Sequence, residues 1–176
     1  MSTVKNYLSL VKFSHTIFAM PFALIGFVLG IAALKNNNIV LQTNEVIVRF
    51  CLVLVCMITA RSAAMGFNRY LDRHFDQLNP RTAIREIPAG IIKAEKALGF
   101  VIANALIFII ATYFINPICF YLSPVALFVI LFYSYTKRFT YLCHLVLGVG
   151  LSLAPIGAYL AVTGSFDILP LLFSFA

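Results

Sequence analysis

The segment Asn68-Arg-Tyr-Leu-Asp72-Arg-His-Phe-Asp76 follows directly on a long apolar run of this 176-residue chain. Asn68, Asp72 and Asp76 recur every four residues, so on an α-helix they share one face over roughly 12 Å. Two carboxylates and an amide suit a divalent cation such as Mg²⁺, which also takes phosphate oxygens from a substrate. Because acidic side chains are costly beside lipid, the segment predicts a membrane helix that ends in a functional site.

The composition around this segment indicates an all-α, polytopic transmembrane helix bundle. Hydrophobic residues make up 62% of the chain and charged residues 11%, against roughly 25% charged residues in a soluble domain. Several apolar runs approach the ~20 residues that cross a bilayer as a helix. The net charge of +7 predicts no nucleic-acid partner, because the basic residues fall where membrane topology would place them.

The apolar runs predict one transmembrane domain over residues 1–176, with five full spans and the start of a sixth. The spans are expected at about 15–34, 46–67, 96–115, 117–136 and 144–162, with a sixth beginning at 168–173. Since an apolar half-helix has no natural place to end, the domain is expected to be truncated at its C-terminus.

The distribution of Lys and Arg predicts the orientation. Most of them lie in the N-terminal segment, the 68–96 connection and the pair Lys137-Arg138, whereas the opposite side has only Lys35 and Arg49. The positive-inside rule then places the N-terminus and the Asp-bearing segment on the cytoplasmic side of the inner (cytoplasmic) membrane.

A solvated helix end is the alternative interpretation of the Asp pair. Arg69 and Arg73 each lie three residues before an aspartate, which permits local ion pairs. However, like charges at i,i+4 are mildly unfavourable, and Asp76 lies near the helix C-terminus, where the dipole disfavours an anion. A bound cation would relieve both effects, and the residues alone leave both interpretations open.

Several basic residues are candidates for substrate binding. Arg61 lies about two turns before Asn68 and either faces a pocket or extends to the interface. Arg81 and Arg85 could bind phosphate oxygens in bidentate geometry or contact lipid head groups. Lys137 is either a membrane-surface anchor or a source of positive charge for a diphosphate pocket.

Two further residues stand at the edge of the first predicted span. Lys12 is a candidate for substrate binding, and His15 is either a satisfied interfacial histidine or a contact to a polar head group.

The segment from Arg61 to Thr82, RSAAMGFNRYLDRHFDQLNPRT, resembles the first Asp-rich motif of the UbiA superfamily of membrane prenyltransferases. It is most similar to the branch that prenylates 4-hydroxybenzoate and related quinone precursors. Supporting segments are Lys12–Pro21 (KFSHTIFAMP), Tyr133–Thr140 (YSYTKRFT), Leu147-Gly and Ala154-Pro-Ile-Gly157.

The resemblance implies an Mg²⁺-dependent prenyltransferase that moves a polyprenyl group from its diphosphate to an aromatic acid, in ubiquinone or menaquinone biosynthesis. Asn68, Asp72 and Asp76 would be the catalytic and metal-binding residues, holding Mg²⁺ and, through it, the diphosphate. Arg81 and Lys137 would contact the diphosphate, and Arg61 would orient the aromatic substrate. The helices of the enzyme are expected to be surrounded by membrane lipid.

One departure from the family pattern leads to two alternative predictions of function. The family carries a second Asp-rich motif in its C-terminal half, and the only acid after Glu95 here is Asp167. The chain is therefore expected to be the N-terminal portion of an enzyme, or else a truncated, non-catalytic module that binds prenyl diphosphate or lipid. A transporter is disfavoured, because its ionisable residues should lie near the bilayer midplane.

Overall fold

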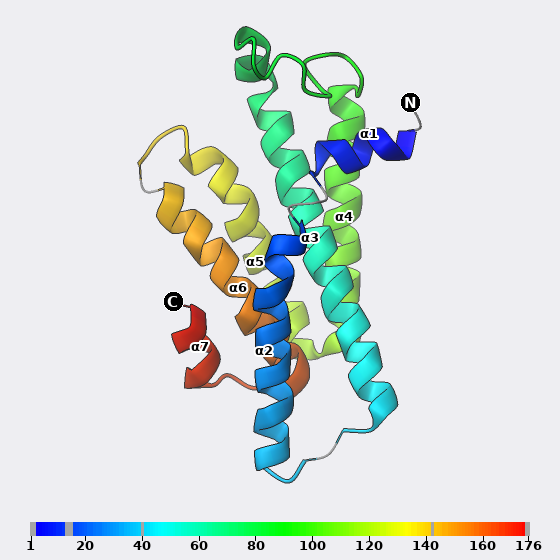
Figure 1. The fold of residues 1–176 in the computed structure, drawn as a ribbon, viewed down its shortest axis with the longest axis vertical. Helices are drawn as coiled ribbons and strands as arrows, with labels where there is room; N and C mark the ends of the chain where they lie inside the picture. Colours follow the sequence, from blue (N-terminus) through cyan, green and yellow to red (C-terminus); the bar gives the residue numbers. More distant parts are fainter. Residues whose placement is uncertain (1–2, 13–15, 40, 142, 175–176) are drawn as a thin grey trace.

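The computed structural model describes residues 3–12, 16–39, 41–141 and 143–174, which form helices joined by turns (Figure 1). The helices are α1 (Thr3–Leu10), α2 (Thr16–Asn36), α3 (Thr43–Leu78), α4 (Ala94–Ile115), α5 (Pro117–Thr136), α6 (Cys143–Thr163) and α7 (Ile168–Ser174). The predicted all-α class is confirmed. Each of α2 to α6 contains or closely matches one predicted span, and α7 begins where the sixth was expected.

Helix α3 is much longer than the span predicted within it. Its 36 residues correspond to about 54 Å, well beyond the ~30 Å hydrocarbon core of a bilayer. It ends at Leu78, because Asn79 adopts an extended backbone before Pro80, which disfavours a helical conformation in its predecessor. The apolar span and the Asn68–Asp76 segment therefore belong to one continuous helix, and the end of the bundle that carries this segment is called the motif end below (Figure 1).

The outer faces of the bundle are suited to lipid. Helices α3, α4, α5 and α6 are each long and apolar enough to cross a membrane, while the apolar part of α2, Met20–Asn36, is shorter. Large apolar side chains on these faces are exposed, for example Val28 (63%), Ile110 (55%) and Phe128 (64%). Apolar surface of this extent requires cover by lipid or by protein.

Helices α2 and α6 lie side by side at short distance (Figure 1). A Cβ atom added at Gly26 would lie 2.2 Å from the carbonyl oxygen of Pro155, and one at Gly30 would lie 2.8 Å from Cβ of Val162. Glycine is therefore required at both positions for close contact between the helices. The buried cluster at this contact includes Ala23, Phe27, Leu34, Val53, Ala158, Ala161 and Val162.

The end of the bundle opposite the motif end is held by two side chains that bind carbonyl groups of α6. Arg49 of α3 donates to the carbonyl oxygen of Val162, and Asn116 Nδ2 donates to that of Leu160 at 2.8 Å. Asn116 also caps α5, since its Oδ1 accepts from the N–H of Cys119 at 2.7 Å. The contacts with Val162 and Cys119 satisfy backbone groups that helix ends leave without partners, and the carbonyl oxygen of Leu160 also accepts from the N–H of Gly164 at 2.9 Å.

Helix α1 was not predicted, and it packs at the motif end (Figure 1). Leu10 is fully buried, and the ring of Tyr7 stacks on that of Phe100 in α4 with centroids 5.0 Å apart. Ser9 Oγ donates to Glu86 Oε1 at 2.5 Å. Helix α1 thereby holds the 79–93 connection between α3 and α4, while His15 lies outside the described residues.

Candidate functional site

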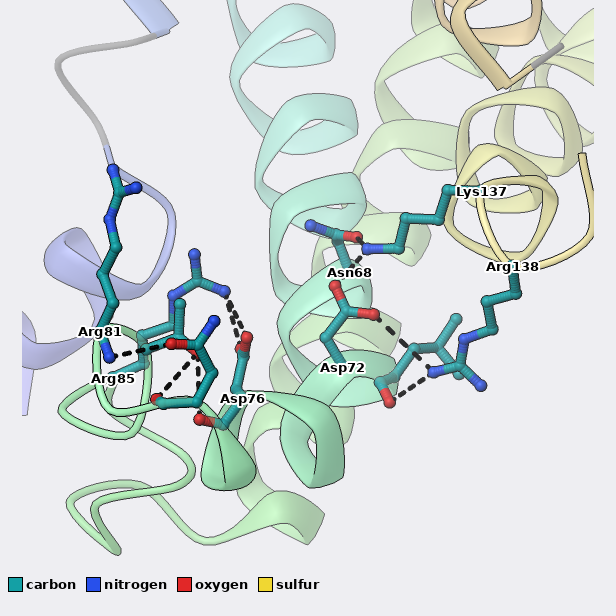
Figure 2. A network of polar contacts seen from close by, with 10 residues as sticks. Asn68, Asp72, Asp76, Arg81, Arg85, Lys137 and Arg138 are labelled. Carbon is teal, nitrogen blue, oxygen red and sulfur yellow. Dashed lines mark hydrogen bonds and ion pairs between the residues drawn. The ribbon is translucent and has the colours of Figure 1, made fainter. Parts of the chain in front are cut away.

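The three polar residues of the motif lie on the last turns of α3 and divide into two neighbouring groups (Figure 2). Asn68 and Asp72 are partly buried and face the end of α5, whereas Asp76 is 7% exposed and faces the 79–93 connection. The predicted shared face describes Asn68 and Asp72, whose side chains meet at Lys137, whereas Asp76 is directed toward the 79–93 connection (Figure 2). Tertiary contacts then give the two carboxylates different partners.

The first group joins Asn68 and Asp72 to the two cations that follow α5. Lys137 Nζ donates to Asn68 Oδ1 and to Asp72 Oδ2. Arg138 Nη2 lies 3.8 Å from Asp72 Oδ1 and donates to the carbonyl oxygen of Leu71 at 2.6 Å. The end of α5 therefore supplies positive charge directly to the motif (Figure 2).

The second group folds the connection after α3 back onto the helix end. Arg85 Nη1 donates to both carboxylate oxygens of Asp76, at 2.7 and 2.8 Å. Thr82 Oγ1 donates to the carbonyl oxygen of Asp76 at 3.0 Å, and Asn79 Oδ1 accepts from the N–H of Arg81 at 3.0 Å. A cation at the C-terminus of a helix is favourable, so Arg85 both neutralises Asp76 and complements the dipole.

The local ion pairs considered for Arg69 and Arg73 are replaced by these remote partners. Arg73 Nη1 donates to the carbonyl oxygen of Tyr70 at 2.7 Å, and its guanidinium lies 4.4 Å from the centroid of the Tyr70 ring. Arg69 is 6% exposed, and its buried Nη1 has no hydrogen-bond partner among the described residues. Arg69 and Arg73 therefore do not form the ion pairs with Asp72 and Asp76 that the alternative interpretation assumed.

An apolar cavity of about 620 Å³ adjoins the first group. It extends along α3 from Val53 to Asn68 and along α6 from Val146 to Ala161. Arg61 also lines it, and the buried Nε of Arg61 has no hydrogen-bond partner in the part of the chain that the structure describes. The cavity thus has a polar end at Asn68, Arg61 lies about 10 Å further along α3, and the other walls are largely apolar.

The remaining predicted site residues are not part of either group. Arg81 is exposed, and its guanidinium extends away from the Asp76 carboxylate (Figure 2). Lys12 is exposed in the connection between α1 and α2 and forms no ion pair with a described carboxylate. Sequence reasoning missed the contact of Arg138 with Asp72, although its position beside Lys137 was a usable signal.

The donor set has the chemistry that an oxygen-preferring cation requires. The amide oxygen of Asn68 and the carboxylate of Asp72 point toward the same ammonium group. No group of three or more His, Cys, Asp or Glu side chains that could hold a metal occurs among the described residues. Mg²⁺ is commonly held by one or two carboxylates with substrate phosphates and water, and Asn68 and Asp72 fit that arrangement.

Comparison with known proteins identifies the family of this chain. Residues 19–176 match the UbiA prenyltransferase family. The chain is 39% identical over 108 residues to the 4-hydroxybenzoate octaprenyltransferase of Tolumonas auensis, covering 61% of this chain and 38% of that protein. It is 34% identical over 128 residues to the protein of the same name from Photobacterium profundum, covering 73% and 44%. The chain therefore aligns with less than half of the length of these two relatives.

Two solved structures share the fold. A UbiA homolog from Aeropyrum pernix K1, in its apo structure, superposes with a TM-score of 0.74 and 30% identity over 92% of this chain and 55% of that one. A structure of digeranylgeranylglyceryl phosphate synthase superposes with a TM-score of 0.77 and 18% identity over 99% and 58%. With its apolar helices, the chain is an integral membrane protein. The resemblance inferred from the Arg61–Thr82 segment is confirmed, and the chain belongs to the UbiA prenyltransferase family.

Proposed function

We propose that this chain is the N-terminal portion, residues 1–176, of a prenyltransferase that moves a polyprenyl group from its diphosphate to an aromatic quinone precursor such as 4-hydroxybenzoate. The observation that carries the proposal is the position of the Asn68–Asp72–Lys137 group at the polar end of the apolar cavity. A diphosphate with an isoprenoid tail has the same polarity: a multiply charged head and a long apolar chain. The names of the two bacterial relatives support the choice of acceptor.

In this proposal the motif binds the head of the prenyl diphosphate. Asn68 and Asp72 would hold Mg²⁺ at the membrane surface and Lys137 would bind diphosphate oxygens, whereas Asp76, expected as a third ligand, is paired with Arg85. Mg²⁺ supplies positive charge that stabilises the leaving diphosphate. Lys137 donates to Asn68 and Asp72 and can add a contact with the diphosphate, since one ammonium group can donate three hydrogen bonds.

The cavity binds the tail and protects the reacting carbon. Departure of the diphosphate leaves an allylic cation, and exclusion of water from an apolar site suppresses its hydrolysis. The aromatic carbon ortho to the hydroxyl group attacks this cation, and the released diphosphate accepts the proton that this carbon then loses. Arg61, whose Nε is buried beside the cavity without a partner, orients the acceptor by binding its carboxylate.

The proposed topology has five spans, α2 to α6, and α7 begins a sixth. The N-terminus and the motif lie on the cytoplasmic side of the inner membrane, in accordance with the excess of Lys and Arg at the motif end. The product would be an intermediate of ubiquinone or menaquinone biosynthesis.

Prenyl transfer to 4-hydroxybenzoate by the protein purified from its own membranes tests the proposal. Activity should require Mg²⁺, disappear with EDTA, and fall at least about a hundredfold in Asp72→Ala, because an interaction with the developing charge is lost. His74→Ala is the matched control, since His74 is exposed on the same helix. Full activity in Asp72→Ala contradicts the proposal.

Binding without transfer is the outcome that favours the alternative function, a non-catalytic module. In that case the wild-type protein binds prenyl diphosphate with Mg²⁺, Asp72→Ala weakens the binding, and no prenylated product forms at any acceptor concentration.

A further inference from the structure

Helix α6 presents a row of very small residues to the apolar cavity. Gly150, Ala154, Gly157 and Ala161 all line it, and their spacing of three or four residues places them on one face of the helix. The facing stretch of α3 contributes Ala60 and Ala64. Larger side chains also line both walls, among them Leu151 and Leu153 of α6 and Met57 and Met65 of α3, so the small residues mark the places where the walls recede.

The two glycines in this row are not required by helix packing. A Cβ atom added at Gly150 or Gly157 would meet no heavy atom within 4 Å, whereas one at Gly26 would lie 2.2 Å from the carbonyl oxygen of Pro155. Glycine also weakens a helix interior relative to alanine. Gly148 and Gly99 also have no neighbour within 4 Å, so what distinguishes Gly150 and Gly157 is that the open volume beside them belongs to the cavity.

The two glycines lie at different depths below the motif. Helix α6 begins at Cys143, shortly after the Lys137-Arg138 pair that contacts α3 (Figure 1). At 1.5 Å per residue, Gly150 lies about 10 Å and Gly157 about 21 Å along the helix from Cys143. A chain that enters the cavity from Asn68 would pass Gly150 first and reach Gly157 only if it is long.

We infer that Gly150 and Gly157 determine the length of isoprenoid chain that the cavity accepts. This inference rests on the proposed function, because it assumes that the cavity holds the tail of the prenyl diphosphate. A larger side chain at Gly157 shortens the cavity from its far end and excludes long chains. A larger side chain at Gly150 obstructs it near the motif and excludes short chains as well.

Leucine substitutions test the inference, and the chain contains a matched control. Gly148 lies two residues from Gly150 on α6, an added Cβ there also meets no atom within 4 Å, and Gly148 does not line the cavity. Gly148→Leu, Gly150→Leu and Gly157→Leu therefore add the same volume to the same helix. Dissociation constants are measured by calorimetry with Mg²⁺, for geranyl diphosphate as the short chain and octaprenyl diphosphate as the long chain.

Gly157→Leu should weaken binding of octaprenyl diphosphate about tenfold or more, because a few methylene groups lose their apolar contacts. The same variant should leave binding of geranyl diphosphate unchanged, which also demonstrates that it is folded. Gly150→Leu should weaken binding of both ligands, and Gly148→Leu should weaken neither. If a leucine variant does not accumulate in the membrane, the valine variant at that position replaces it in the same comparison.

The outcomes separate this inference from the proposed function. Wild-type protein that binds neither ligand contradicts the proposed function. Wild-type protein that binds both, with the same ratio of dissociation constants in all three leucine variants, leaves the proposed function intact and overturns the role of Gly150 and Gly157.

Discussion

Arg85 Nη1 donates to both carboxylate oxygens of Asp76, at 2.7 and 2.8 Å, across the turn that ends α3. Asp76 is 7% exposed and lies at a helix C-terminus, where both burial and the dipole disfavour a negative charge. The Arg85 cation offsets these two costs. It also fixes the 79–93 connection against the end of the helix that carries Asp72.

Arg85→Ala is expected to destabilise the protein. The variant leaves the Asp76 carboxylate buried without its cation, at a cost of roughly 1–3 kcal/mol, less than for a fully buried pair, because the Arg85 side chain is 33% exposed. Thermal unfolding in detergent should show a Tm lower by several degrees. Arg81→Ala is the control, since Arg81 is exposed on the same connection; equal losses in both variants would refute the specific role of the pair.

Lys137→Gln is expected to weaken binding of prenyl diphosphate about tenfold, the effect of losing one charge-assisted hydrogen bond. Calorimetry with geranyl diphosphate and Mg²⁺ measures this loss. Lys93→Gln removes the same charge from an exposed position before α4, and its dissociation constant should equal that of the wild type. An unchanged constant in Lys137→Gln would show that the contact with Asn68 and Asp72 serves only to join α5 to α3.

Gly26→Ala is expected to separate α2 from α6. Its added Cβ would lie 2.2 Å from a backbone oxygen that cannot move independently of α6, and overpacking of this kind typically costs about 1–3 kcal/mol. Gly99→Ala adds the same methyl group to α4, where no atom lies within 4 Å, and should be neutral or slightly stabilising because alanine favours helix. A Tm for Gly26→Ala at or above that of Gly99→Ala contradicts the packing argument.

The stability of the connection between α6 and α7 is expected to depend on pH through Asp167. The hydroxyl group of Tyr159 and the N–H groups of Ile168 and Leu169 donate to its carboxylate and hold its pKa below the usual range. A lowered pKa means that the stabilisation is complete above the unfolded-state pKa and is lost as the pH falls through the folded-state pKa. NMR titration of the Asp167 carboxyl carbon should give a midpoint below that of an unstructured aspartate, and Tyr159→Phe should move the midpoint upward. A midpoint that does not change in Tyr159→Phe would contradict this account.

The sequence predicts those features of the fold that depend on residues close together in the chain. The boundary between α4 and α5 follows from Asn116-Pro117, because Asn caps a helix and Pro starts one. Hydropathy marks where α3 leaves the apolar region near Phe67, but it does not mark the end of the helix, which only the turn at Asn79 provides. Helix α1 was missed because it is short, and burial of Leu10 depends on contacts with distant parts of the chain.

The spacing on which the candidate site rests can be read from the sequence, whereas the pairings of its side chains cannot. The spacing of Asn68, Asp72 and Asp76 is a local property of one helix. The partner of Asp72 comes from the end of α5, and the partner of Asp76 comes from a folded connection. Ion pairs between residues far apart in sequence are set by the packing of helices, which no spacing on α3 alone reveals.

Because α3 is long, the geometry of the candidate site should depend on the thickness of the bilayer. Arg49 near one end of this helix holds α6, and Asp72 near the other end holds the cation that follows α5. The two lie about 35 Å apart along the helix axis, close to the ~30 Å of a typical hydrocarbon core. A helix that is long for its membrane tilts, and a tilt of α3 would move Asp72 relative to Lys137. Lipids with shorter acyl chains should therefore alter the geometry of the Asp72–Lys137 contact without any change in the amino-acid sequence.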